Sequence, residues 1–222
     1  MQTLAFIHVL SGAIAVAVGA VALTARKGAT AHIVAGRVFV GAMTLSSVLG
    51  AALGLVRADD FLITTFAGVL AAYLVVSGWL AAQDRNVGRR SATGMLSLAN
   101  FLNAAALFSI GYVALSGDGA FRGFPAEDYF FLGGMAGIAV VGDAAWFLRK
   151  RISDRQRIAR HLWRMCLGFF IAAGSAFTGP GQSAFPEAVR NSGLLSLPEL
   201  IIFLALVFYL GKTLFTGANR PG

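Results

Sequence analysis

The residues of this 222-residue chain that could do chemistry gather near one end of its apolar stretches. Asp143 lies a few residues inside the end of one stretch, and Arg37 and Arg164 fall at nearly the same depth on two others. Because a helix rises about 1.5 Å per residue, these three side chains can share one layer of a membrane. The same layer holds four further polar residues, which are Lys27, His32, Ser77 and His161.

An ionised carboxylate alone in hydrocarbon is costly, so we expect Asp143 to pair with Arg37 or Arg164. Two interpretations of this polar layer stay open. In the first, an ion-pair network joins three helices, and the histidines form interfacial hydrogen bonds. In the second, the layer is a cytoplasm-facing site for an anionic headgroup, a quinone or a haem propionate. Both interpretations require the stretches that carry the three residues to be neighbours.

The three histidines are candidate cofactor ligands. His32 and His161 are alike in depth, so they could serve as the two axial ligands of a b-type haem. His8 lies towards the opposite membrane surface, too far away to share one metal ion with them. Met135 has a depth similar to that of His8, which leaves a His/Met site open. The alternative is that each histidine is a hydrogen-bonded core residue, and the identity of any metal is left open.

Two amides lie near the middle of another apolar stretch, at Asn100 and Asn103. Amides at this depth usually hold helices together by hydrogen bonds. The other interpretation is a polar pathway for a solute or ion. No catalytic residue is assigned, because the chain has no phosphate loop, HExxH helix, GxSxG elbow or EF-hand.

The elements that must position these residues are seven long apolar segments. The chain is 57% hydrophobic and only 13% charged, and a stretch of about 20 apolar residues spans a bilayer. Only helices or closed barrels satisfy the backbone in lipid, and these segments lack the alternating polarity of barrel strands. We therefore predict an all-α, integral membrane bundle formed by residues 1–222 as one domain. The predicted spans are 4–24, 33–56, 61–82, 92–115, 129–148, 161–180 and 197–216.

The basic residues predict how the bundle is oriented. Fifteen of the 18 lie on one side of the predicted spans, and only Arg57, Arg122 and Arg190 lie on the other. Since cytoplasmic loops carry the excess of Lys and Arg, the N-terminus is expected outside and the C-terminus in the cytoplasm. The net charge of +8 is therefore assigned to topology and to anionic lipid headgroups at segment 149–164, rather than to nucleic acid.

Small residues predict close helix packing. Gly50 and Gly54 have the spacing that lets helix backbones approach, as do Gly133 and Gly137. Packing within one chain is one interpretation, and a homo-oligomer seam is the other. Cys166 is the single cysteine, which excludes an intramolecular disulfide.

Two segments resemble a bacterial family of membrane proteins, domain of unknown function 2306. The first runs from Arg26-Lys27-Gly28 through His32 and Gly36-Arg37 to Met43, after a first span that supplies His8. The second is Arg160-His161-Leu162-Trp163-Arg164-Met165. The resemblance implies a multi-pass protein of the bacterial inner membrane and no established reaction. It points to residues that the depth argument also selects: His8, Lys27, His32, Arg37, His161 and Arg164.

Three functions are compatible with these observations. The first is a haem- or quinone-linked redox protein with its polar site near the cytoplasmic leaflet. The second is a small-solute or ion permease that uses the Asn100 and Asn103 region. The third is a non-catalytic lipid-binding or assembly partner protein.

Overall fold

The computed structural model describes residues 2–83 and 90–215, excluding the side chains of residues 90 and 91. Arg85, Arg89 and Arg220, which contribute to the charge count, lie outside the described residues. Seven helices in the described part are long and apolar enough to cross a membrane, which confirms an all-α, multi-pass architecture. They are α1 (Gln2–Thr24), α2 (Thr30–Val56), α3 (Ala58–Gln83), α4 (Arg90–Ser116), α5 (Ala126–Leu148), α6 (Asp154–Ala173) and α8 (Leu197–Phe215).

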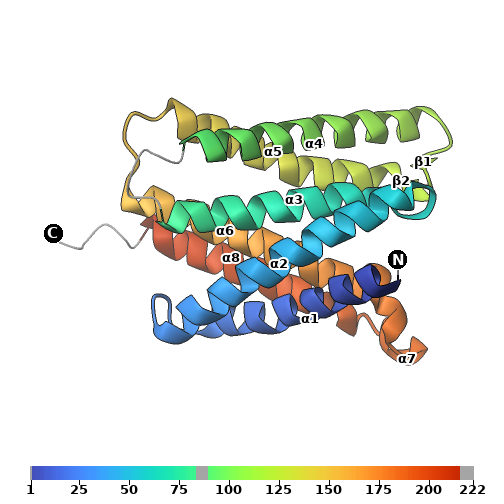
Figure 1. Ribbon diagram of the computed structural model, residues 1–222, viewed down its shortest axis with the longest axis horizontal. Coiled ribbons are helices and arrows are strands. Elements are labelled where there is room, and N and C mark those ends of the chain that lie inside the picture. The colour runs from blue at the N-terminus through green and yellow to red at the C-terminus, as the bar shows by residue number, and fades with distance from the viewer. Residues whose placement is uncertain (1, 84–89, 216–222) are drawn as a thin grey trace.

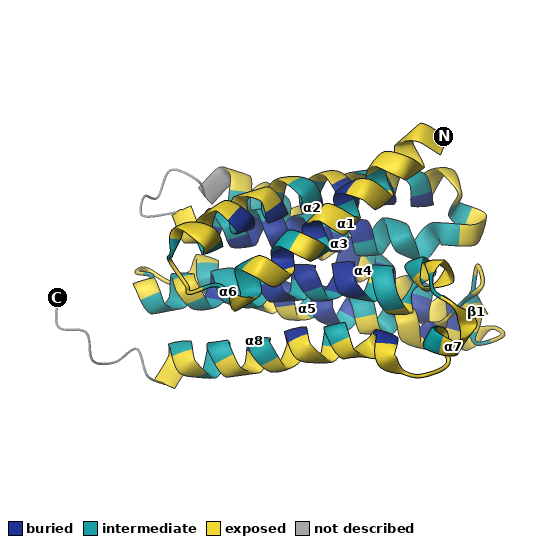
Figure 2. Cartoon of the chain, turned by 90° about the horizontal axis from the view of Figure 1, so that it is seen from below, coloured by how far each residue is buried: buried dark blue, intermediate teal, exposed yellow. Residues whose placement is uncertain are grey.

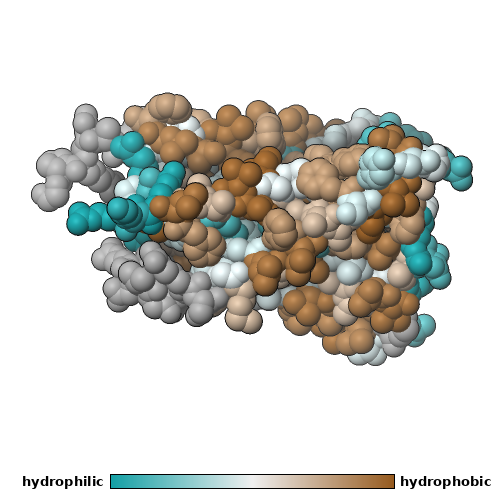
Figure 3. Space-filling view, turned by 90° about the horizontal axis from the view of Figure 1, so that it is seen from above, coloured by the Kyte–Doolittle hydropathy of each residue, from teal (hydrophilic) through white to brown (hydrophobic). Residues whose placement is uncertain are grey.

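The seven helices run side by side along the long axis of the molecule (Figure 1). Helix α1 begins at one end of the bundle and α8 finishes at the other. We call the end that carries the α1–α2 turn (25–29) and the α5–α6 connection (149–153) the basic end. The middle of the face in Figure 3 is mainly hydrophobic, whereas hydrophilic residues gather at both ends. This distribution is what a bilayer requires of a spanning protein.

Helix α3 lies at the centre of the bundle. It packs against α2, α6 and α4, while α1 packs on α2, α5 packs on α4, and α8 packs on α6. The buried residues therefore concentrate along α3 and the inward faces of its neighbours (Figure 2). Leu70, Leu74 and Val75 of α3 are completely buried.

Glycine lets the first three helices approach closely. A Cβ on Gly50 of α2 would lie 2.8 Å from the His8 ring of α1. A Cβ on Gly68 of α3 would lie 2.6 Å from the Ser47 carbonyl of α2. Gly54 of α2 is equally close to the backbone of α3, and Gly133 of α5 faces Leu107 of α4. The glycine spacings thus serve contacts within this chain.

Short elements complete the end opposite the basic end. A two-stranded antiparallel hairpin joins α4 to α5 and is formed by β1 (Ala120–Phe121) and β2 (Phe124–Pro125). Helix α6 passes into a π-helical turn, Gly174–Thr178. The path to α8 then contains 3-10 turns at Pro180–Ala184 and Leu194–Ser196 and the short α7 (Glu187–Arg190). Part of the segment between the predicted spans 161–180 and 197–216 is therefore helical.

Helix α6 begins earlier than its expected span, at Asp154 rather than at residue 161. Ser153 accepts a hydrogen bond from the Gln156 backbone N–H (3.3 Å), and the Gln156 side chain accepts one from the Ser153 N–H (3.0 Å). This reciprocal capping box satisfies two N–H groups of the first turn. The earlier start adds about two polar turns to the apolar part of α6, and Arg160 lies on these turns.

Candidate functional site

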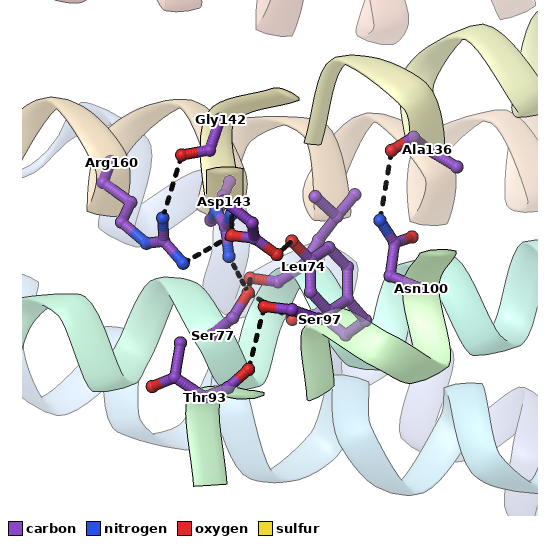
Figure 4. A network of polar contacts seen from close by, with 11 residues as sticks. Leu74, Ser77, Thr93, Ser97, Asn100, Ala136, Gly142, Asp143 and Arg160 are labelled. Carbon is purple, nitrogen blue, oxygen red and sulfur yellow. Dashed lines mark hydrogen bonds and ion pairs between the residues drawn. The ribbon is translucent and has the colours of Figure 1, made fainter. Parts of the chain in front are cut away.

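Asp143 of α5 is the centre of a buried polar cluster near the basic end. Its Oδ1 accepts hydrogen bonds from Arg160 (2.6 Å) and Arg164, both on α6, and its Oδ2 accepts one from the Tyr73 hydroxyl on α3 (2.7 Å). Ser97 of α4 lies beside the same carboxylate (Figure 4). The expected pair of Asp143 and Arg164 is present, and four helices meet at one acidic side chain.

Arg164 is enclosed completely. Its side chain is 0% exposed and lies between the aromatic rings of Tyr73 and Trp163, each about 5.0 Å away. One terminal nitrogen donates to the Ser77 hydroxyl at 2.5 Å, as the shared depth of the two residues suggested. Its Nε has no hydrogen-bond partner among the described residues.

Arg160 links the buried cluster to the molecular surface. It is 5% exposed, its guanidinium lies 4.4 Å from the ring of Trp146, and its Nη1 donates to the Gly142 carbonyl (3.5 Å). From the sequence, Arg160 was assigned to topology and to the lipid-facing basic segment 149–164, not to the polar cluster. The four-residue spacing between Arg160 and Arg164 could have predicted its role, because this spacing places both guanidinium groups on one helix face.

The structure does not bring Arg37 or Lys27 into this cluster. Arg37 is exposed on α2, which packs on α1 and α3 and not extensively on α5. Lys27 instead donates to the Ala22 and Leu23 carbonyls at the end of α1 (3.1 and 2.6 Å) and lies over the Tyr209 ring. Partial burial lowers the pKa of Lys27 from its usual value.

A cleft of about 720 Å³ opens beside Arg160 at the basic end. It lies between α5, the start of α6 and the end of α8, and it has Trp146 and Trp163 in its wall. Three arginines line it, namely Arg149, Arg155 and Arg160, and none of the described residues in its lining is acidic. Arg155 also donates to the Leu214 carbonyl (3.2 Å) and so joins α6 to the last turn of α8.

The three histidines share one hydrogen-bonding arrangement. Each Nδ1 lies within hydrogen-bond distance of a backbone carbonyl: His8 with Ser46 (2.8 Å), His32 with Ala22 (2.9 Å) and His161 with Gly78 (3.0 Å). Because a carbonyl can only accept, Nδ1 carries the proton in each of these hydrogen bonds. His161 is also close enough to His32 and Lys27 to interact with them electrostatically.

The space beside these histidines is limited. His161 lines a cavity of about 230 Å³ between the end of α3 and the start of α6, below the roughly 300–1,000 Å³ of small-molecule sites. Among the described residues, no group of three or more His, Cys, Asp or Glu side chains is placed to hold a metal ion. His8 belongs to α1 and Met135 to α5, two helices that do not pack extensively on each other.

The two amides of α4 both bind backbone carbonyls. Asn100 Nδ2 donates to the Ala136 carbonyl of α5 (3.1 Å; Figure 4), and Asn103 Nδ2 donates to the Phe66 carbonyl of α3 (3.3 Å). These contacts hold α4 to its neighbours. Asn100 Oδ1 has no partner among the described residues although the side chain is 0% exposed.

The fold and the site thus define a multi-pass, all-α membrane protein with a buried ion-pair cluster beside a basic cleft. Comparison with known proteins adds no family: no family model, no curated protein and no solved structure matches the chain.

Proposed function

We propose that this chain binds an anionic amphiphile in the cleft between α5, α6 and α8. In this proposal the protein lies in the bacterial inner membrane, with its N-terminus outside and its basic end in the cytoplasm. The proposal joins the expected anionic-headgroup site to the lipid-binding hypothesis and assigns no catalytic residue. The observation that carries it is a cleft whose described lining contains three arginines and no acidic residue.

The charge behind the cleft supports an anionic ligand. Arg160 and Arg164 both bind Asp143, so two guanidinium groups share one carboxylate and leave an excess positive charge. Arginine does not release its proton in proteins, so this charge cannot be removed by titration. Buried charges in proteins are paired, and Arg160 is placed where a ligand in the cleft can complete the balance.

The apolar surroundings support a ligand with a hydrocarbon tail. Phe147, Leu148 and Phe215 lie next to the cleft in sequence and are exposed, by 42%, 84% and 84% of their surface. Helices α5 and α8 do not pack extensively on each other, so the cleft borders surface that acyl chains cover. Trp146 and Trp163 fit this position, because indole rings favour the boundary between headgroups and hydrocarbon.

The experiment is a lipid-binding measurement by native mass spectrometry in detergent. Phosphatidylglycerol is expected to bind more tightly than phosphatidylcholine with the same tails. Arg155→Gln should weaken phosphatidylglycerol binding about tenfold, a loss of about 1.4 kcal/mol. The matched control is Arg151→Gln, an exposed residue of the same connection that does not line the cleft. Equal losses in the two variants, or no preference between the lipids, would contradict the proposal.

A redox role is the second candidate, carried by the arrangement of the histidines. A histidine that binds a metal through one nitrogen usually donates its other N–H to a carbonyl or carboxylate. His8, His32 and His161 each have this arrangement already. A reduced-minus-oxidised absorption spectrum of the purified protein tests the candidate. A haem signal that disappears in His161→Ala supports it, and a spectrum without such a signal counts against it.

We also propose that the resemblance to the domain of unknown function 2306 family reflects common descent. The support is limited to the residues of the two similar segments. Among them, His161 and Arg164 occupy the region of the cavity and the buried cluster. The permease hypothesis has less support from geometry, because the Nδ2 groups of Asn100 and Asn103 both bind backbone carbonyls.

A further inference from the structure

We infer that the headgroup bound in the cleft carries a terminal phosphate monoester, as in phosphatidate or an isoprenyl phosphate. This inference rests on the proposed function and names the ligand class of the same site. A monoester phosphate carries about −1.5 to −2 charges near pH 7, whereas the diester phosphate of phosphatidylglycerol carries a single negative charge.

The charge of the site matches a headgroup with more than one negative charge. Arg149, Arg155 and Arg160 line the cleft, and Arg164 stands directly behind it. Among the described residues, Asp143 is the only carboxylate bound to these arginines, so four guanidinium groups and one carboxylate leave a net charge of +3 in this part of the structure. The nearby Asp154 does not change this count, because it pairs with Arg157 at 2.7 Å. A headgroup with one negative charge would leave more of this positive charge uncompensated than a headgroup with two.

The start of α6 adds a second feature that suits phosphate. Ser153 and Gln156, the two capping residues, both line the cleft, so the N-terminus of a 20-residue helix opens onto it. Helix N-termini carry a partial positive charge and free N–H groups, and they bind phosphate groups for this reason. Arg155 stands in the same turn, and its guanidinium can contact two phosphate oxygens at once.

A zwitterionic headgroup fits less well. The face of Trp146 that could receive a quaternary ammonium is occupied by the Arg160 guanidinium at 4.4 Å. An ammonium group would also meet the arginines that line the cleft. The charges around the site therefore select against a headgroup that carries its own cation.

The test compares two glycerolipids that have identical tails and different phosphates, together with an isoprenyl phosphate. Purified protein in detergent micelles is titrated with phosphatidate, phosphatidylglycerol or an isoprenyl phosphate, and binding is followed by tryptophan fluorescence. Phosphatidate is expected to bind about tenfold more tightly than phosphatidylglycerol near neutral pH. An isoprenyl phosphate that binds like phosphatidate identifies the phosphate as the recognised group. Preference for one of these two lipids identifies the physiological source.

The pH profile separates the lipid's charge from that of the protein. The second ionisation of a monoester has a pKa of about 6, so phosphatidate affinity should rise between about pH 5 and about pH 8. Asp143, Asp154 and Lys212 are titratable groups at the same end of the bundle, and His161 lines the adjacent cavity. Phosphatidylglycerol keeps one negative charge over this range, so its pH profile shows whether titration of these groups changes the charge of the site. A rise in phosphatidate affinity while phosphatidylglycerol affinity stays constant therefore reports the ionisation of the phosphate.

The outcomes distinguish this inference from the proposed function. A pH-dependent preference for phosphatidate that Arg155→Gln abolishes and Arg151→Gln retains supports both. Equal, pH-independent binding of both anionic lipids that still depends on Arg155 overturns the monoester inference alone. Binding that Arg155→Gln leaves unchanged overturns the proposed site as well. Inorganic phosphate that displaces the lipid at micromolar concentration would show that a soluble anion is the ligand, and it would contradict the lipid class.

Discussion

Arg160 and Arg164 donate hydrogen bonds to the same oxygen, Oδ1 of Asp143, from positions four residues apart on α6. The second carboxylate oxygen accepts a hydrogen bond from Tyr73. One acidic side chain therefore joins α3, α5 and α6, yet it balances only one of the two positive charges. This arrangement stabilises the bundle and leaves the adjoining cleft positive, so the stability of the cluster and the function of the cleft can be tested separately.

Replacing Asp143 tests the stabilising role of the cluster. Asp143→Asn removes the carboxylate that binds both Arg160 and Arg164, and breaking a buried ion pair in this way costs about 3–5 kcal/mol. Thermal unfolding in detergent should show a correspondingly lower midpoint. The matched control is Asp60→Asn, which removes the exposed ion pair with Arg57 and should cost at most about 1 kcal/mol. If the two variants unfold alike, Asp143 does not hold the helices together.

The Tyr73 hydroxyl offers a milder test of the same cluster. Tyr73→Phe removes one hydrogen bond to a charged group, a loss of about 1.5–3 kcal/mol. The loss should shrink in the Asp143→Asn background, because the two side chains act on one network. Tyr112→Phe is the control, since Tyr112 is 68% exposed and should tolerate the change. Strict additivity of the two substitutions in unfolding experiments would argue against the network.

The close approach of α2 and α3 predicts that replacing glycine by alanine lowers stability at the contact between these helices but not at an open position. In Gly68→Ala the new Cβ would lie 2.6 Å from the Ser47 carbonyl oxygen and 2.9 Å from the Ala51 nitrogen. Both contacts are with backbone, which cannot rotate away, so overpacking should cost about 1–3 kcal/mol. Gly41→Ala meets nothing within 4 Å and should be neutral or slightly stabilising. Unfolding midpoints check the difference, and a harmless Gly68→Ala would contradict the packing.

The proposed orientation is checked by labelling single cysteines in intact cells. Cys166 is buried and is first replaced by alanine to give a background without reactive thiols. In this background Asp118→Cys, between α4 and α5, should react with an impermeant maleimide from the outside. Arg151→Cys, between α5 and α6, should react only after the membrane is permeabilised. The reverse pattern would place the basic end outside the cell.

Sequence reasoning reached the helices and half of the cluster. Seven apolar stretches predicted the bundle, and the cost of an intramembrane carboxylate predicted a partner for Asp143. Arg164 was found because its depth follows from its distance to the end of an apolar stretch. Arg160 was missed because it precedes the predicted span 161–180 and was assigned to lipid headgroups with the rest of segment 149–164, although the Ser153 and Gln156 capping pattern is present in the sequence.

The remainder depends on which helices are neighbours, and depth alone does not provide that information. Arg37 has the right depth, but α2 packs on α1 and α3, so its side chain is exposed instead of facing Asp143. The cleft is a stronger example, because it needs α8 to place Leu214 beside Arg155, 59 residues earlier in the chain. Hydropathy reports how far a helix extends through the membrane and not which partner it meets.

The central claim is that a lipid headgroup completes the charge balance of the Asp143 cluster. An experimental structure in nanodiscs that contain phosphatidate tests this claim most directly. We predict headgroup density within hydrogen-bond distance of Arg155 and Arg160, with its acyl chains leaving between α5 and α8. A structure in the same lipid with water alone between these arginines, or with Arg160 turned away from the cleft, would contradict the account.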